Sequence, residues 1–327
     1  MGFGPSNWET PEKIITQIFE YLSQNGVGSR RWRSLSCSAF QPEPLFKLIH
    51  LLNQEPAPNL HHLCLTVDSN WFGGSSVEAR CPTEAHYRDA YSLSENAVPG
   101  LRHVELTYVS WKYVFTIDRS TPLLTGLTTL KLTAGYEHPR SLVQIHNILS
   151  ANSRLELLEL NLGRAEGGYE SYYLSNNQRL NPVHLWSLRV LSLNGDDHFS
   201  WVWNIISIIN TPFIESLSLG GNSWDNNADL MELFDYIITG QFPGKNSSSD
   251  PSVNKPIFPL VRELDISGLF RPSIDHIISG IPPFRSVTHL SIYCPDARRI
   301  LNGIRHALPH LGNLSLTCVA RKPHNCL

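Results

Sequence analysis

A short apolar pattern recurs along this chain and constrains its fold more than any other feature. In each copy an apolar residue is followed by a second one three positions later and a third one two positions after that, as in "LELLEL" at residues 155 to 160. A helix favours apolar steps of three and four, whereas a strand favours steps of two. The step of two therefore predicts a short strand with one buried face, and the step of three predicts a chain that turns into that strand.

The pattern recurs at a fairly regular interval. Successive copies begin between 24 residues apart (Val287 to Leu311) and 47 residues apart (Ile214 to Val261). Most intervals lie close to the period of about 20 to 29 residues that is typical of leucine-rich repeats, and the two longest indicate repeats with insertions. The ten copies begin at Trp32, Leu60, Leu101, Leu127, Leu155, Leu188, Ile214, Val261, Val287 and Leu311.

Stretches with apolar residues at helical spacing separate many of the copies. They span residues 43 to 54, 141 to 152, 198 to 209, 228 to 239 and 296 to 308. A regular alternation of strand and helix predicts parallel strands on one side of the protein and helices on the other. The sequence therefore predicts an α/β fold, an irregular leucine-rich-repeat solenoid of about ten repeats with strands on the concave face and helices on the convex face.

The chain is expected to contain an N-terminal helical cap at residues 1–30 and a leucine-rich-repeat domain at residues 31–327. Two segments fall outside the repeat period, at about residues 68–99 and 240–256. The second is rich in Gly, Ser, Pro and Asn, which favours a loop. The first contains Trp71, which we expect either to pack on the repeats or to present a contact surface.

Composition disfavours several classes of partner. The formal net charge is -3, and the sequence has no surplus of basic residues that would neutralise nucleic-acid phosphates, so nucleic acid is not expected as a partner. The most apolar stretch, at residues 199 to 209, is shorter than the roughly 18 residues that a membrane-spanning helix needs. The first residues have neither a basic nor an apolar signal region, so a cytoplasmic or nuclear location is expected.

Several local motifs resemble those of one known family. "RWRSLSC" at residues 31 to 37, "EPLFKLIHLL" at 43 to 52, "APNLHHLCL" at 57 to 65 and the long irregular repeats resemble the leucine-rich-repeat part of fungal F-box proteins, especially those expanded in mushrooms. The resemblance covers roughly residues 30 to 318. It implies a protein in which an F-box binds the Skp-type adaptor of a cullin ubiquitin ligase and the repeats hold the substrate.

The chain also departs from that family. "PEKIITQIFEYL" at residues 11 to 22 looks like a first F-box helix, but a full F-box has further helices and Trp32 already begins the first repeat. We therefore expect this helix to pack beneath the first strand, and we do not expect the chain to bind the Skp-type adaptor. The asparagine that commonly follows leucine-rich strands has its one clear example at Asn222, which favours the irregular kind of repeat.

Candidate catalytic and metal-binding residues are few. His62 and Cys64 lie two apart on one predicted strand, and His103 is expected beside His62 on the next strand, so the three side chains could converge on zinc. Polar side chains facing solvent are the commoner outcome, so no metal or other cofactor is expected. Asp196, Asp197 and His198 precede a predicted helix, where acidic groups more often cap the helix than catalyse.

The solvent-facing strand positions favour protein recognition. The central positions read Glu105, Lys131 and Glu159, which alternate in charge and are predicted to contact a partner or simply to pair with one another. The other candidate partner-binding residues are Trp71 and, along the strands, His62, His103, Glu263, His289 and Tyr293.

These positions predict a shallow, polar face that suits a protein or peptide better than a small molecule. The expected function is a non-enzymatic interaction module, the substrate-recognition part of an F-box-type ubiquitin ligase receptor. The alternative is a stand-alone scaffold without a ligase link.

Overall fold

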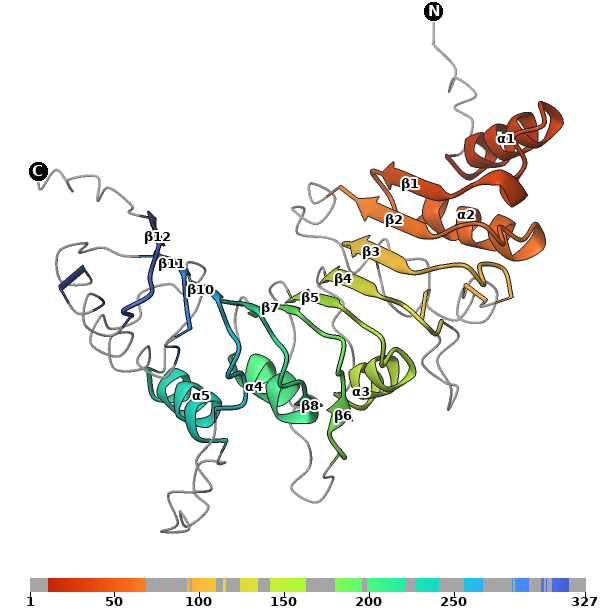
Figure 1. Ribbon diagram of the computed structural model, residues 1–327. Helices are drawn as coiled ribbons and strands as arrows, with labels where there is room; N and C mark the ends of the chain where they lie inside the picture. Colours follow the sequence, from red (N-terminus) through yellow and green to blue (C-terminus); the bar gives the residue numbers. More distant parts are fainter. Residues whose placement is uncertain are drawn as a thin grey trace, which may run out of the picture. The chain divides into compact units, whose positions relative to one another are not determined.

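The computed structural model describes residues 11–68, 93–94, 96–109, 114–115, 124–134, 142–162, 180–195, 199–221, 227–240, 256–266, 284, 286–293, 301–302, 304 and 308–317. These residues form an α/β protein with parallel strands, and helices lie between some of the strands along the chain (Figure 1). The chain divides into two compact units, Met1–Asn152 and Ser153–Leu327.

The first unit contains four parallel strands among its described residues, in the order β1-β2-β3-β4. Each strand pairs with the next one along the chain, and Ser36, Cys64, Glu105 and Lys131 lie in register across all four. The elements are α1 (Pro11–Gln24), the 3-10 helix η1 (Ser29–Arg31), β1 (Ser34–Ala39), α2 (Glu43–Gln54), β2 (His62–Val67), β3 (His103–Thr107), β4 (Thr129–Ala134) and α3 (Leu142–Ala151).

The second unit contains six parallel strands among its described residues, in the order β5-β7-β9-β10-β11-β12, and the short strands β6 and β8 pair separately. The elements are β5 (Leu157–Leu162), β6 (Val183–His184), β7 (Val190–Gly195), α4 (Phe199–Ile208), β8 (Ile209–Asn210), β9 (Ser216–Gly220), α5 (Asn227–Thr239), β10 (Glu263–Ile266), β11 (His289–Tyr293) and β12 (Asn313–Thr317).

Each copy of the apolar pattern contains one strand, which begins two residues after the copy does. In the eight copies between the first and the last, the three apolar positions are buried, as at Leu155, Leu158 and Leu160, which are at most 1% exposed. The strand side chains alternate between a buried inner face and a more exposed outward face because successive residues of a strand point to opposite sides. The prediction of strands with one buried face is therefore confirmed.

The inner positions of β1 and β12 are only half-buried. β1 begins the strand order and β12 ends it, and each has a neighbouring strand on one side only among the described residues. Fewer neighbours cover the inner side chains there, which accounts for their greater exposure.

Four of the predicted helices are present as α2, α3, α4 and α5, and the fifth, at 296 to 308, lies largely outside the described residues. Their apolar stripes supply the core, as at Leu45, Ile49 and Leu52 of α2, each 0% exposed. One boundary differs from the prediction. Ile209 leaves the helical stretch and pairs with Val183 as part of β8, a conformation that β-branched residues favour.

Several predicted features lie outside the described residues: Trp71, most of the insertions at 68–99 and 240–256, the group Asp196 to His198, and Asn222. Helix α1 contacts α2, the helix between β1 and β2. The proposed boundary between a cap at 1–30 and a repeat domain at 31–327 stays a prediction. None of the helices within the described ranges has the length and apolar content that a bilayer span requires.

Candidate interaction surfaces

The outward face is the set of strand side chains that alternate with the buried leucines. In the first unit it consists of three rows across β1 to β4, which are mostly small, hydroxyl-bearing or imidazole side chains. The rows are Ser34, His62, His103 and Thr129; Ser36, Cys64, Glu105 and Lys131; and Ser38, Thr66, Thr107 and Thr133. This face is polar and carries few charges.

The predicted cluster of His62, Cys64 and His103 is only partly brought together. The two imidazole rings lie with centroids 6.2 Å apart, edge to face, and Nδ1 of His62 hydrogen-bonds the Ser34 hydroxyl at 3.1 Å. Within the part of the chain that the structure describes, no group of three or more His, Cys, Asp or Glu side chains is placed to hold a metal ion. The zinc-site alternative therefore gains no support from this geometry.

The charged centre of the first unit's outward face is an ion pair between neighbouring strands. Lys131 Nζ lies 3.9 Å from Glu105 Oε2, and the two side chains are 37% and 40% exposed. Solvent screens such a pair, so its contribution to stability is about 0 to 1 kcal/mol. Glu159 lies on β5 of the second unit, in register with Ser192. Its predicted place beside Lys131 stays a prediction.

In the second unit the structure brings Glu263 and His289 into register on β10 and β11. His289 Nε2 lies 2.6 Å from the Asn313 amide nitrogen, and its Nδ1 lies 2.9 Å from the Thr288 hydroxyl. Because the amide nitrogen donates, Nε2 is the acceptor and Nδ1 carries the hydrogen. Both ring nitrogens are engaged, so the imidazole has a fixed orientation. Tyr293 ends β11 opposite Thr317.

A second line of side chains, the edge row, comes just before the strands. Backbone N–H groups link each of its residues to the previous one, as from Arg102 to His61 at 3.0 Å and from Glu215 to Arg189 at 2.8 Å. The row consists of Arg33, His61, Arg102 and Thr128 in the first unit, and of Glu156, Arg189, Glu215, Arg262 and Thr288 in the second. Reasoning from alternate strand positions missed these residues, but they occupy the second position of each copy of the pattern.

An aromatic cluster lies beside the edge row of the second unit. His184 stacks on Trp186, with centroids 5.4 Å apart and an interplanar angle of 9°, and Trp186 lies 6.2 Å from Phe213. Trp186 is 53% exposed and Phe213 is 39% exposed. We name His184, Trp186 and Phe213 the aromatic cluster.

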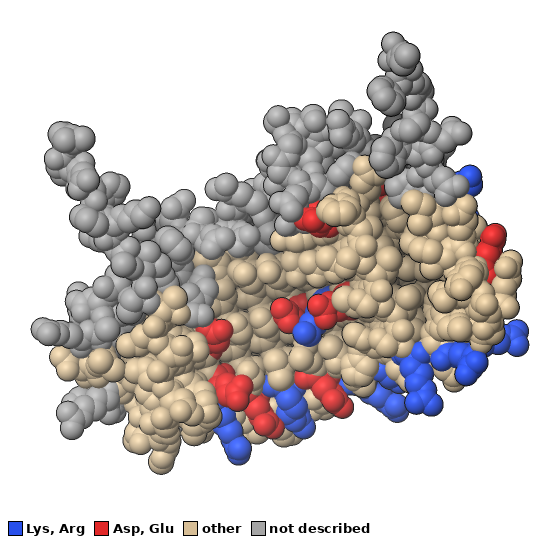
Figure 2. Space-filling view, turned by 90° about the horizontal axis from the view of Figure 1, so that it is seen from above, with Lys and Arg blue, Asp and Glu red and all other residues tan. Residues whose placement is uncertain are grey.

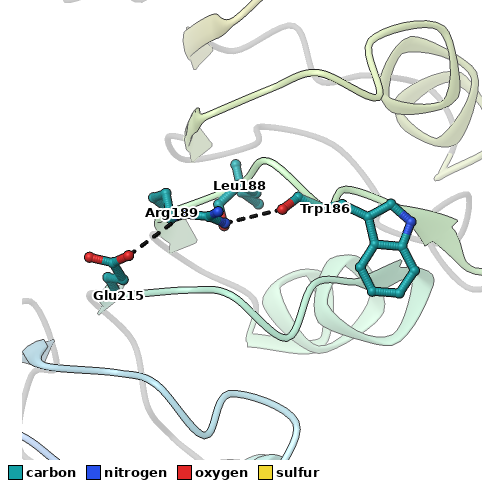
Figure 3. A network of polar contacts seen from close by, with 4 residues as sticks. All are labelled: Trp186, Leu188, Arg189 and Glu215. Carbon is teal, nitrogen blue, oxygen red and sulfur yellow. Dashed lines mark hydrogen bonds and ion pairs between the residues drawn. The ribbon is translucent and has the colours of Figure 1, made fainter.

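Arg189 contacts two members of this cluster, the Phe213 ring and the Trp186 backbone. Its guanidinium carbon lies 5.1 Å from the centroid of Phe213, and its Nε lies 3.6 Å from Glu215 Oε1. Its Nη1 donates to the backbone oxygen of Trp186 at 3.1 Å (Figure 3). The arginine restricts the Phe213 ring, and stacking on His184 restricts the indole, before any partner binds. This restriction lowers the entropy lost on binding.

A third exposed surface lies on helix α1. Ile14, Ile18 and Tyr21 recur at helical spacing and are 43%, 50% and 66% exposed. The opposite side of the helix is anchored, because Phe19 packs edge to face against Trp32 with centroids 5.2 Å apart. The indole nitrogen of Trp32 also donates to the backbone oxygen of Val27 at 2.8 Å.

The titratable groups with shifted pKa values do not favour a nucleophilic site. Burial raises the pKa of the Cys37 thiol, which keeps it protonated and a weak nucleophile at neutral pH. Burial likewise raises the pKa of Tyr236, whose ring packs against Trp203 at 4.8 Å between centroids. Neither shift lowers a pKa in the way that activates a nucleophile.

Comparison with known proteins gives no relative from which a function could be transferred. No protein-family model matches the sequence, and no match was found among curated proteins or solved structures.

Proposed function

We propose that this chain is a non-enzymatic protein-binding module built as an irregular leucine-rich-repeat solenoid, with about ten repeats, strands on its concave face and helices on its convex face. The recurrence of one strand in every copy of the pattern supports this proposal, as does the in-register parallel pairing within each unit. Stacked repeats of this kind offer long polar faces that suit proteins and peptides. The proposed location is the cytoplasm or nucleus.

The observation that carries the proposal is the aromatic cluster with Arg189. Trp, Tyr and Arg are enriched among the residues that contribute most to protein interfaces. A half-exposed indole that stacks on an imidazole presents a large apolar area at low entropic cost. The cluster lies on a surface whose other side chains are mostly polar, so it is a distinct anchor point for a partner.

Affinity capture with three forms of the full chain tests the proposal. The wild type should retain a defined set of proteins, Trp186→Ala should lose members of that set at least about tenfold in abundance, and Phe40→Ala should retain them. Phe40 is the matched control because it is an aromatic residue of the first unit that is 77% exposed. Identical sets captured by all three forms would exclude the cluster as the binding site.

Within this function, we place the chain as the substrate-recognition part of an F-box-type ubiquitin ligase receptor. The support for this proposal is the sequence resemblance of residues 30 to 318. The alternative is a stand-alone scaffold without a ligase link. Peptides of ubiquitin ligase subunits or ubiquitylated substrates among the Trp186-dependent captured proteins would favour the receptor, and their absence would favour the scaffold.

The isolated chain is not expected to bind the Skp-type adaptor directly. Helix α1 is one amphipathic helix, and its anchored side already packs against the first strand region through Trp32. A pull-down with purified adaptor checks this expectation. Binding that disappears when residues 1 to 24 are deleted would contradict it.

A further inference from the structure

Four arginines gather at one edge of the first unit. Arg30 and Arg31 belong to η1, Arg33 comes just before β1, and Arg102 comes just before β3; all four are exposed. We name them the arginine edge. Figure 2 shows Lys and Arg side chains gathered along one edge of the surface, at the lower right.

The arginine edge has a defined geometry because the backbone ladder holds it. The N–H of His61 donates to Arg33 O at 2.8 Å, and the N–H of Arg102 donates to His61 O at 3.0 Å. Arg33 and Arg102 are thus two strand spacings apart, about 10 Å at about 4.8 Å per strand. The Asn59 amide donates to Arg30 O at 2.7 Å and fixes η1 against the segment before β2.

Two of the guanidinium groups are held without being neutralised. Arg31 Nη1 donates to Gly26 O at 3.0 Å, and Arg102 Nη1 donates to Leu101 O at 2.8 Å. A backbone carbonyl orients a guanidinium but carries no net charge, so the remaining N–H donors keep their affinity for an anion. Between Arg33 and Arg102, the His61 ring is held through its Nδ1 by Gly100 O at 2.8 Å.

None of the ion pairs within the described ranges involves the arginine edge. Glu105 pairs instead with Lys131. Glu55 Oε1 lies beside Gly28, 3.4 Å from where a Cβ on that glycine would stand, and forms no ion pair with the arginines. The positive charge of this edge is therefore not neutralised by a described carboxylate.

The second unit provides a contrast at the equivalent positions. Its edge row alternates in charge through Glu156, Arg189, Glu215 and Arg262, and Arg189 pairs with Glu215 at 3.6 Å. There the charges compensate one another within the protein. In the first unit the same row is cationic or neutral, so none of its described members offsets the charges of Arg33 and Arg102.

We propose that the arginine edge binds an extended acidic segment of a partner protein. Carboxylates match the paired N–H donors of guanidinium groups. A segment in the extended polyproline II conformation has three residues per turn and advances about 3.1 Å per residue. Acidic side chains three residues apart then lie on one face and span about 9 Å, close to the distance of about 10 Å between Arg33 and Arg102. The formal net charge of -3 disfavours a long polyanion such as nucleic acid, whereas a short acidic segment meets the arginine edge alone. The inference rests on the proposed protein-binding function and names the chemistry of a partner at a surface separate from the aromatic cluster.

The test uses a fluorescein-labelled synthetic peptide with glutamate at every third position and glycine or serine elsewhere, titrated with the full chain and followed by fluorescence anisotropy. The same peptide with glutamine in place of glutamate is the ligand control. The wild type should bind the glutamate peptide, and binding should weaken as salt is raised because screening acts on exposed charges. The glutamine peptide should not bind.

The variant Arg33→Glu/Arg102→Glu should weaken binding of the glutamate peptide by at least about tenfold, because like charges then face each other across the contact. The matched control is Arg154→Glu/Arg262→Glu, which changes two exposed arginines of the second unit and shifts the net charge equally. It should bind within about twofold of the wild type, since distant exposed charges are screened. Circular dichroism confirms that both variants fold.

Three results would overturn the proposal. The first two are no binding of the glutamate peptide by the wild type and an equal loss of peptide affinity in both double variants. The third is displacement of the peptide by polyuridine RNA or phosphatidylserine vesicles at a lower concentration than by unlabelled peptide. The Trp186→Ala variant should bind the peptide like the wild type. Failure of the arginine edge is therefore distinguishable from failure of the aromatic cluster.

Discussion

The buried amide of Asn152 ties the end of α3 to the segment that leads into β4. The side chain is 0% exposed, and its Oδ1 accepts from the Leu127 N–H at 2.9 Å. Its Nδ2 donates to Ile148 O at 2.8 Å and to Leu124 O at 3.2 Å. One side chain thus satisfies three buried backbone groups, each of which would be costly to leave without a partner.

We expect Asn152→Ala to lower the free energy of unfolding by about 1 to 3 kcal/mol, because buried donors and acceptors lose their partner. Urea denaturation measures the change. Asn25→Ala is the control: its amide donates to Tyr21 O at an exposed position, so the change should stay within about 0.5 kcal/mol. Equal effects of the two substitutions would contradict the role assigned to Asn152.

Lys131 tests whether the outward face of the first unit takes part in recognition. Lys131→Glu replaces an exposed ion pair by like charges, which should change stability by no more than about 1 kcal/mol. If the face contacts the partner, affinity for a captured protein should fall at least about tenfold. Binding and melting temperature are measured for wild type, Lys131→Glu and Lys131→Ala. Unchanged affinity in both variants would make the pair a purely structural contact.

At the scale of the secondary-structure elements, α1 has one buried and one exposed side, and substitutions on the two sides should differ in their effect on stability. Phe19 packs against Trp32 and is 7% exposed, whereas the neighbouring Ile18 is 50% exposed. Phe19→Ala should lower the free energy of unfolding by about 3 kcal/mol because it leaves a cavity, whereas Ile18→Lys should change it by less than about 0.5 kcal/mol. Chemical denaturation of the two variants side by side checks this. A large loss in Ile18→Lys would show that the exposed side of α1 is covered in solution.

The elements differ in how far their sequence determines them. The strands were predictable because a step of two between leucines, as at Leu158 and Leu160, fits only a strand with one buried face. The end of α4 was not predictable, because Ile209 fits either a helix or a strand. Its pairing with Val183, which determines that it belongs to β8, is not visible in the sequence. The aromatic cluster was missed because Trp186 and Phe213 lie outside the alternating positions, and only the fold brings them together.

At the scale of the whole molecule, the chain divides into two compact units, and each contains buried leucines of its own strands. In a stack of repeats each element contacts mainly its neighbours, so a local defect need not spread along the chain. The buried leucines of β2 and β7 belong to different units and are comparable in exposure, with Leu63 and Leu191 both 0% exposed.

We expect Leu63→Ala to destabilise the first unit by about 2 to 5 kcal/mol through the cavity that it leaves. Hydrogen exchange followed by mass spectrometry should show faster exchange in peptides from β1 to β4 than in peptides from β7 to β11. Leu191→Ala is the reciprocal control and should produce the opposite pattern. A uniform acceleration along the chain in both variants would show that the units unfold as one.

The separation between buried leucines and outward side chains has a consequence for how such a chain can change over generations. Each strand contributes one side chain to each outward row, and its leucines lie on the other side of the sheet. A substitution such as a serine to a charged residue in one row alters the surface at a single place and leaves the packed interior intact. New partners can therefore be acquired by one-residue steps, each tolerated by the fold before the next occurs, which makes this architecture an evolvable and readily engineered binding surface.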